Sequence, residues 1–239
     1  MRILGHRGAR GEAPENTIAG FLYAKNLGLD AFEFDVYLAK DEKLVVIHDA
    51  TVDRTTNGSG QVIDFTSVEL AALDARAGFT NYPLPCGVPL LDEVLDVVED
   101  AAYMQIEIKR DEAARLERAI PQLLQTVDDR KLKSKVVITS FDDTALQILG
   151  RIAPDYPMWS LLGAFDSMDW IERAQQLRCK QINASLQKAK LEVINEARQQ
   201  GMKVGGYGGN TPEHVQRAKE LKVECFTTDY PTRVEEWLR

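Results

Sequence analysis

The sequence predicts an α/β fold, a (β/α)8 TIM barrel with a small inserted subdomain after the second strand. A length of 239 residues suits one large barrel domain. Short apolar runs with strand patterning alternate regularly with segments of helical periodicity. Eight such units remain when the returning arm of one hairpin is left outside the barrel wall, and eight units favour a closed barrel over an open doubly wound sheet.

Each strand of the predicted wall is followed by a helical segment. The strands begin at residues 3, 31, 103, 136, 158, 181, 203 and 225. The helices are expected over 18–27, 91–98, 113–130, 142–152, 168–177, 191–200, 212–221 and 232–238. Asn16 or Thr17 can cap the first helix, and Gly28 is placed to end it.

The second predicted strand alternates apolar and polar residues, which places Glu33 and Asp35 on one face. A polar turn then leads into 44–49, too soon for a crossover helix, so the two runs are expected to form a hairpin. If the turn is centred near Asp41 and Glu42, His48 lies opposite Asp35 across the ladder.

Residues 50–87 are rich in turn-forming residues and contain one short helical pattern, over Val68–Ala75. A long excursion directly after a strand that carries charged residues is typical of a lid or substrate cap, although a solvated loop is the plainer alternative. We therefore expect one domain over 1–239, with an inserted cap at about 50–87.

The composition limits the partners. A net charge of −8 argues against nucleic acid or an anionic membrane surface as the main partner, so a small-molecule substrate is expected. Three widely spaced cysteines (Cys86, Cys179 and Cys225) resemble reduced thiols rather than a zinc site. Because the chain shows neither a signal-peptide pattern nor an apolar run of membrane-spanning length, we expect a cytoplasmic protein.

Charged side chains gather at the carboxyl ends of the predicted strands, where barrel enzymes place their active sites. Glu33, Asp35 and Glu107 are expected to face the barrel interior, and an all-oxygen set of this kind suits a divalent ion such as Mg²⁺ or Ca²⁺. An internal salt-bridge network with Arg7 and Lys109 is the alternative. These two cations could instead bind the oxygens of a phosphate.

Two of the three histidines, His6 and His48, fall at predicted strand ends. Histidine is well suited to give and take protons near neutral pH, so the pair could divide acid and base roles around a phosphodiester. His214 lies in a predicted helix and is expected at the surface.

Taken together, the motifs resemble the glycerophosphodiester phosphodiesterase family over nearly the whole chain. In order, they are His6-Arg7-Gly8 with Pro14-Glu15-Asn16-Thr17, Glu33-Phe34-Asp35, His48-Asp49, Arg54-Thr55-Thr56, Glu107-Ile108-Lys109 and Thr228-Asp229-Tyr230-Pro231. The resemblance implies metal-dependent hydrolysis of glycerophosphodiesters to sn-glycerol 3-phosphate and an alcohol. It also implies that His6 and His48 are the acid–base pair, that Glu33, Asp35 and Glu107 bind the metal, and that Arg7 and Lys109 contact the phosphate.

Asn16, Tyr207 and Asn210 are further expected to line the substrate site. The chain departs from the family near the seventh strand, where a tryptophan followed by a Val-Asn pair is usual and this sequence has Gly205-Gly206-Tyr207-Gly208-Gly209-Asn210. We expect the four glycines to loosen this segment and to open space on the glycerol side.

Two other functions remain open at this point. A lysophospholipase D-like enzyme acting at membranes needs an apolar entry, for which the candidates are Trp159, Leu161, Leu162 and Phe165. A non-catalytic phosphometabolite-binding barrel would not need two histidines placed for proton transfer.

Overall fold

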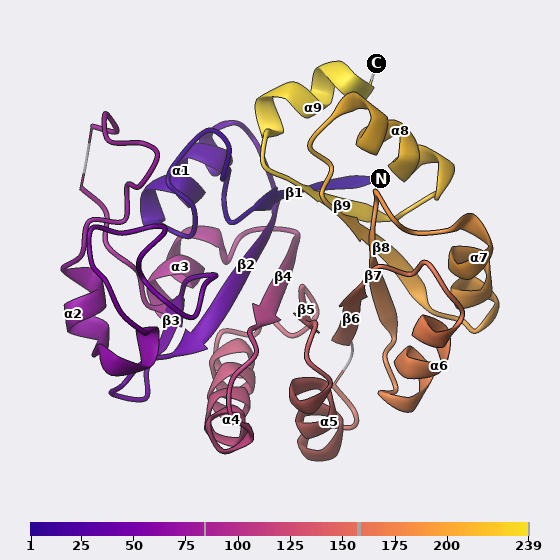
Figure 1. The fold of residues 1–239 in the computed structure, drawn as a ribbon, viewed down its shortest axis with the longest axis horizontal. Helices are drawn as coiled ribbons and strands as arrows, with labels where there is room; N and C mark the ends of the chain where they lie inside the picture. Colours follow the sequence, from indigo (N-terminus) through magenta and orange to yellow (C-terminus); the bar gives the residue numbers. More distant parts are fainter. Residues whose placement is uncertain (84, 157–158, 239) are drawn as a thin grey trace.

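A computed structural model of the chain describes residues 1–83, 85–156 and 159–238, which form a ring of strands inside a ring of helices (Figure 1). The strands are β1 (Arg2–His6), β2 (Ala31–Leu38), β3 (Leu44–Val46), β4 (Tyr103–Ile108), β5 (Val136–Ser140), β6 (Trp159–Gly163), β7 (Gln181–Ser185), β8 (Lys203–Tyr207) and β9 (Cys225–Thr228). β1 pairs in parallel with both β2 and β9, so eight strands close into a barrel. The predicted (β/α)8 fold is therefore confirmed.

The strand starts agree with the sequence to within one residue. One predicted start, Met158, lies outside the described residues, and β6 is described from Trp159. β3 pairs antiparallel with β2 and stays outside the closed ring, as expected for the returning arm of a hairpin.

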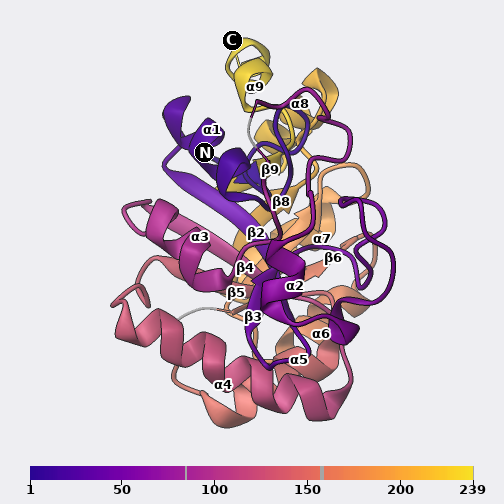
Figure 2. The same cartoon turned by 90° about the vertical axis from the view of Figure 1, so that its left-hand side faces the viewer.

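The helices cover the outside of the barrel in Figures 1 and 2. They are α1 (Ile18–Asn26), α2 (Ser67–Ala71), α3 (Leu91–Val98), α4 (Ala113–Asp129), α5 (Asp143–Ile152), α6 (Asp169–Gln176), α7 (Leu191–Gln199), α8 (Pro212–Glu220) and α9 (Pro231–Leu238). The helix α1 begins where the sequence predicts, because the Thr17 hydroxyl accepts a hydrogen bond from Gly20 N at 3.1 Å. Among the described residues, no helix has the length and apolar character needed to cross a membrane.

The hairpin register differs from the prediction by one residue. Val36 pairs with Val46, which places Ile47 opposite Asp35, and Ile47 N donates to Asp35 O at 3.1 Å. The loop is centred on Asp41, and the left-handed backbone of Glu42 (φ 59°) closes it as a three-residue turn. His48 therefore follows the ladder in a bend, where its ring can turn toward the barrel mouth.

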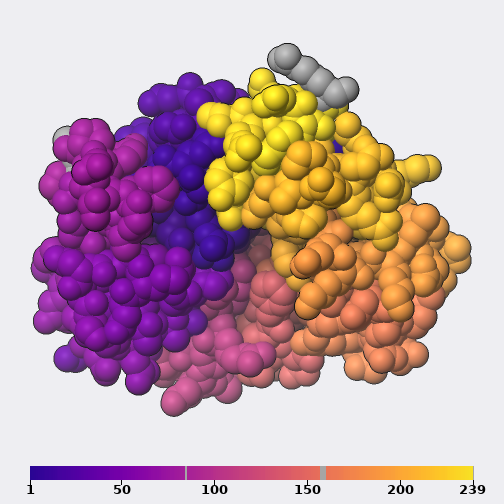
Figure 3. Space-filling view, turned by 45° about the horizontal axis from the view of Figure 1, so that its top comes forward, coloured from indigo at the N-terminus to yellow at the C-terminus, as the bar shows by residue number. Residues whose placement is uncertain are grey.

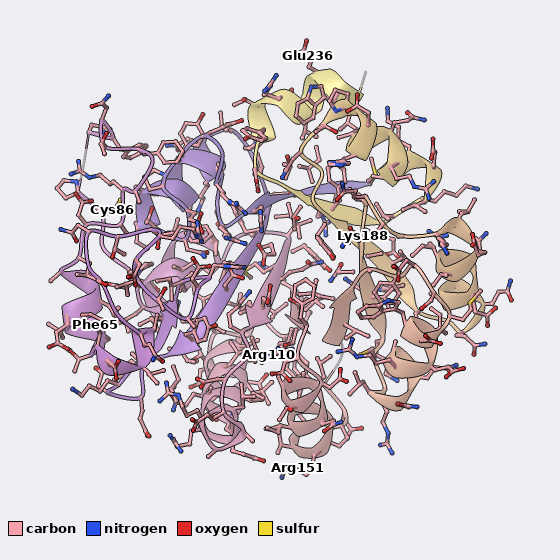
Figure 4. The ribbon with its side chains drawn as sticks, in the orientation of Figure 1. Phe65, Cys86, Arg110, Arg151, Lys188 and Glu236 are labelled. Carbon is pink, nitrogen blue, oxygen red and sulfur yellow. The ribbon has the colours of Figure 1, made fainter. Side chains whose placement is uncertain are left out.

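The segment between β3 and α3 packs against the outer side of β2 and β3. It contains a 3₁₀ turn, η1 (Val62–Asp64), and α2, and a small apolar cluster lies under it. Phe65 and Cys86, both labelled in Figure 4, mark this segment beside the barrel. The helix α2 is shorter than predicted because Asp74 N donates to the Asn57 side chain (2.9 Å) and Ala75 N donates to Cys86 O, which ends helical hydrogen bonding.

The main core lies between the strands and the outer helices. Phe21 of α1 packs edge-on against Phe32 and Phe34 of β2, with ring centroids 6.1 and 5.5 Å apart. The three cysteines are free thiols, as predicted; Cys179 and Cys225 are buried. His214 is half-buried in α8, so the expected surface position is only partly correct.

Candidate active site

The strand register gathers the predicted site residues at one end of the barrel. His6 pairs with Glu33, and Asp35 pairs with Glu107. Paired residues of parallel strands point to the same side of the sheet, so the alternation seen in the sequence becomes one ring of inward-facing side chains. Figure 4 shows side-chain nitrogen and oxygen atoms gathered inside the ring of strands.

Glu33, Asp35 and Glu107 form a compact buried cluster whose carboxylate oxygens lie within 4.8 Å of one another. Burial, together with the charges of Asp35 and Glu107, raises the pKa of Glu33 well above its ordinary value of 4.5. The pKa of Glu107 rises to about 7, through burial first and then repulsion by Asp35. Three carboxylates this close disfavour one another's charge.

Two cations compensate the cluster in part. Lys109 Nζ lies 2.6 Å from Glu107 Oε1 and 3.4 Å from Asp35 Oδ1, and Arg7 Nε lies 3.3 Å from Asp35 Oδ2. Burial alone would raise the pKa of Asp35, but Lys109 and Arg7 hold it below its ordinary range. Three carboxylates thus face two cations, so one carboxylate of the cluster has no cation of its own among the described residues.

The donor set fits a hard divalent ion. Glu33 Oε2 and Asp35 Oδ1 are buried without a hydrogen-bond partner among the described residues, and so is the amide oxygen Oδ1 of Asn16. Buried oxygens without partners are unfavourable unless a cation or water satisfies them. Carboxylate and amide oxygens are the ligands that Mg²⁺ and Ca²⁺ prefer.

His6 is held from behind by a carboxylate. Its Nδ1 bonds to Asp229 Oδ1, and its Nε2 lies 3.6 Å from Glu33 Oε2. Asn210 binds Asp229 twice, donating through Nδ2 to Oδ2 (2.9 Å) and accepting from Asp229 N at Oδ1 (2.8 Å). The ring of His6 is thereby fixed with Nε2 toward the acidic cluster.

His48 is also held by a carboxylate. Its Nδ1 lies 2.6 Å from Asp49 Oδ1, and the second oxygen of Asp49 accepts from Arg54 Nε at 2.5 Å. Burial lowers the pKa of His48, although Asp35 opposes this shift. Hydrogen bonds from Arg54 and His48 outweigh burial and bring the pKa of Asp49 to about 2.

Local backbone strain places two of the predicted residues. Arg7 and Asn16 have left-handed backbone, with φ of 52° and 53°, which residues with a Cβ adopt rarely. Asn16 N donates to Arg7 O, and Asn16 Nδ2 donates to Asp35 Oδ2 at 2.9 Å. This strained turn brings both side chains to Asp35.

The glycine-rich segment lies at the end of β8 and directly after it, and it is closely packed at three of its four glycines, so the expectation that it is loose is wrong at these positions. A Cβ at the fourth, Gly208, would meet nothing within 4 Å. A Cβ at Gly205 would lie 1.9 Å from Asn183 Oδ1, and one at Gly209 would lie 2.2 Å from the Phe226 ring. Side chains of neighbouring strands therefore occupy the space that these glycines leave. Tyr207 packs edge-on against Phe141 at 5.7 Å and gives this side of the barrel mouth an aromatic wall.

The contacts of Asn210 favour a different role from the one expected. Both polar atoms of its side chain bind Asp229, so it lies behind His6. Its contact with substrate stays a prediction. The apolar entry also lacks support, because Leu161, Leu162 and Phe165 are buried in the core, and the side chain of Trp159 lies outside the described residues.

Three residues of the site have no role that the sequence alone predicts. Asp49 follows His48 directly, and Glu15 stands in the Pro14–Thr17 motif. The motifs draw attention to both residues, but the sequence does not indicate which side chains they bind. Thr139 pairs in register with Glu107, and its buried hydroxyl has no hydrogen-bond partner among the described residues. Only the barrel closure brings it beside the acidic cluster.

Fold and site together define a phosphoric diester hydrolase built on a (β/α)8 barrel. The sequence profile of the glycerophosphoryl diester phosphodiesterase family matches residues 6–233. A glycerophosphodiester phosphodiesterase of Caldanaerobacter subterraneus subsp. tengcongensis is 32% identical over 231 residues, covering 96% of this chain and 94% of that protein. The chain therefore belongs to the glycerophosphoryl diester phosphodiesterase family.

Solved structures agree with this assignment. A glycerophosphodiester phosphodiesterase of Agrobacterium tumefaciens is 29% identical, with a TM-score of 0.80 over 97% of each chain. An Oleispira antarctica phosphodiesterase in complex with its product sn-glycerol-3-phosphate has a TM-score of 0.89 over 100% of this chain and 96% of that chain. At 24% identity, this second structure supports the fold.

Proposed function

We propose that the protein hydrolyses glycerophosphodiesters to sn-glycerol 3-phosphate and an alcohol in a reaction that requires a divalent metal. One observation carries the proposal. Two histidines, each bonded through Nδ1 to a carboxylate, lie beside a buried acidic cluster. Among the described residues, the cluster holds three carboxylates against two cations. Acid–base groups on both sides of an ion site are what cleavage of a phosphodiester needs.

Glu33, Asp35 and Glu107 would hold the ion, and Mg²⁺ and Ca²⁺ are the candidates. A bound ion supplies positive charge next to the oxygens of the phosphate, where negative charge builds during the reaction. Arg7 Nε, which is buried and makes no hydrogen bond among the described residues, and Lys109 Nζ supply further positive charge to those oxygens.

The two histidines divide the proton transfers. With Nδ1 engaged by Asp229 or Asp49, the ring nitrogen that exchanges a proton is Nε2. One histidine takes the proton of the glycerol hydroxyl that attacks phosphorus, and the other donates a proton to the alcohol oxygen as its bond to phosphorus breaks. Water then opens the resulting cyclic phosphate, with the two histidines exchanging roles, and sn-glycerol 3-phosphate is formed. Tyr207 contributes an aromatic surface beside the phosphate, and Asn16 holds Asp35.

We also propose that the chain is a single barrel domain in which residues 50–87 act as a cap over the site, in a cytoplasmic enzyme. The contact of Arg54 with Glu15 supports the cap, because it ties this segment to the strained turn after β1. Figure 3 shows the indigo N-terminal residues lying between the purple cap and the yellow and orange C-terminal part.

The test is release of glycerol 3-phosphate from glycerophosphocholine with Mg²⁺ or Ca²⁺. We expect activity that is lost with EDTA and that falls by about 10²- to 10⁴-fold in His6→Ala and in His48→Ala. His214→Ala is the matched control, since His214 lies in α8, and its activity should be unchanged. Full activity in both site variants would refute the acid–base pair.

A second substrate assigns the two roles. A phosphodiester with a p-nitrophenol leaving group needs less protonation of the leaving oxygen. The variant that lacks the acid should therefore lose much less activity on this substrate than on glycerophosphocholine, whereas the variant that lacks the base should lose activity on both.

A further inference from the structure

Glu15 contacts three arginines at once. Its Oε1 accepts from Arg7 Nη1 (2.8 Å) and from Arg54 Nη2 (2.8 Å), and its Oε2 accepts from Arg54 Nη1 (2.7 Å) and lies 3.6 Å from Arg10 Nε. Its side chain is only 11% exposed. Burial alone would raise the pKa of Glu15, but the hydrogen bonds from Arg54 and Arg7 lower it, so Glu15 stays charged.

Two of these arginines reach the carboxylates behind the histidines. Arg54 binds Asp49, whose other oxygen contacts His48 Nδ1. Arg10 Nε lies 3.9 Å from Asp229 Oδ2, and the other oxygen of Asp229 contacts His6 Nδ1. Glu15 is thus linked to the His48–Asp49 pair through Arg54. Arg10 links it to the His6–Asp229 pair.

The geometry of the Arg54 contact is specific. Its guanidinium meets both oxygens of Glu15 through the two Nη atoms and meets Asp49 through Nε, so its plane is fixed by two carboxylates. Without the charge at Glu15, the Arg54 guanidinium is free to turn so that its Nη atoms, as well as Nε, donate to Asp49. It would then compete with His48 Nδ1 for the Asp49 oxygens.

The geometry points to Glu15 as a positioning residue that holds Arg54 and Arg10 and thereby sets the orientation of both His48 and His6. This inference rests on the proposed function, in which both histidines transfer protons. It extends that function by tying the two histidines to one buried carboxylate.

Glu15→Gln tests the role because it keeps the size of the side chain and removes its charge. We expect kcat on glycerophosphocholine to fall by about 10- to 100-fold, as is usual when a partner that orients a catalytic group is lost. Glu117→Gln is the matched control. Glu117 also binds an arginine through both oxygens, Arg151, which lies at the outer edge of α5 in Figure 4. The activity of this control should match that of the wild type.

Arg54→Gln separates positioning from substrate binding. Arg54 is 44% exposed, so this variant should fold. We expect kcat to fall while KM stays within about threefold. Loss of a group that binds the substrate and the transition state equally well would instead raise KM and leave kcat unchanged. The double variant Glu15→Gln with Arg54→Gln should lose less than the product of the single losses, because both changes break one linkage.

A spectroscopic test does not depend on activity. A histidine Nδ1 proton bonded to a carboxylate gives a low-field proton NMR signal, and the wild type should show one for each pair. Glu15→Gln should shift or broaden both signals, and Glu117→Gln should leave both unchanged.

Unchanged low-field signals together with wild-type kcat in Glu15→Gln would overturn the inference. A raised KM with unchanged kcat in Arg54→Gln would overturn it as well, since Arg54 would then contact the substrate itself. Wild-type protein that is inactive on glycerophosphodiesters with either metal would refute the proposed function, and the NMR comparison would still test the position of the two rings.

Discussion

The two ends of the barrel interior are both polar, but in different ways. Toward the amino ends of the strands, Gln105 donates to Asn183 (3.2 Å), Gln181 donates to Tyr103 (3.1 Å), and Asn183 donates to Ser160 (3.0 Å). These groups are neutral and satisfy one another. Toward the carboxyl ends, the next inward-facing positions along the strands carry charged side chains. These are the three carboxylates of the acidic cluster and the two cations beside it, Arg7 and Lys109.

Gln105 and Glu107 make the difference plain, since they lie two residues apart on β4 and face the same interior. The Gln105 side chain donates to several neighbours, whereas the pKa of Glu107 is raised to about 7 by burial and by Asp35. A barrel of this size can evidently be filled by neutral hydrogen-bonded side chains. Charge retained at one end, at a cost in stability, therefore supports the proposal that the reaction takes place at that end.

Cavity size does not mark that end. A cavity of about 800 Å³ opens at the amino ends of the strands, where the Arg2 guanidinium lies 5.4 Å above the Tyr103 ring. Its lining includes both positive and negative side chains, Lys203 and Glu224 among them. The carboxyl end is distinguished by its chemistry, because charged groups converge there and several of their buried atoms have no hydrogen-bond partner among the described residues.

Replacing a charged side chain at the carboxyl end should have the largest effect of these substitutions, and the effect should be on activity. Glu107→Gln removes one of the three proposed metal ligands, and we expect kcat/KM to fall by roughly 1,000-fold. Thermal stability of the metal-free protein should be unchanged or higher, because the substitution relieves repulsion with Asp35. Steady-state kinetics and thermal unfolding measure the two effects, and retention of metal-dependent activity within about tenfold would contradict the ligand assignment.

Introducing a charge at the amino end should lower the stability of the protein. Gln105→Glu buries a carboxylate without a cation beside it, and we expect the free energy of unfolding to fall by about 3 kcal/mol. Urea denaturation near pH 7 measures the loss, which should shrink at low pH, where the new group is neutral. Gln125→Glu, at an exposed position of α4, is the control and should change stability by less than about 0.5 kcal/mol.

Gly205 tests the packing between neighbouring strands of the neutral layer. Gly205→Ala places a methyl group against Asn183 Oδ1 and should lower the free energy of unfolding by about 2 kcal/mol. In an Asn183→Ser background, which frees that space, the further loss should be under about 1 kcal/mol. Equal losses in the two backgrounds would mean that the glycine is needed for another reason.

The pH dependence of the metal-free protein tests the charge at the carboxyl end without a substitution. The pKa of Glu107 is about 7 in the folded state against 4.5 ordinarily, so the folded state binds more protons between these values. Its contribution to stability is present below pH 4.5 and is lost as pH rises through 7. The Tm of the wild type should therefore fall more steeply over this range than that of Glu107→Gln.

Metal binding should act in the opposite direction on the same cluster. Mg²⁺ or Ca²⁺ at ten times its Kd should stabilise the folded state by about 1.4 kcal/mol. The resulting rise in Tm should be larger at pH 8 than at pH 5, because protons compete for the ligands. An equal rise at both pH values, or an equal rise in Glu107→Gln, would place the ion elsewhere.

The sequence by itself determined the features that depend on local periodicity. Alternation in β2 and β4 set Glu33, Asp35 and Glu107 on one face, and the count of strand–helix units indicated a closed barrel. The cap at Thr17 was equally local, since it joins residues three apart. Patterns of this kind survive folding because neighbouring residues along the chain impose them.

Tertiary structure alone decided the contacts between distant residues. Glu15 and Arg54 are 39 residues apart and His6 and Asp229 are 223 apart, so no local pattern could pair them. The hairpin register depended on one left-handed residue in the turn, and the space beside Gly205 and Gly209 proved to be filled by side chains of neighbouring strands. Such contacts are set when the barrel closes, because only then do the carboxyl ends of all its strands meet.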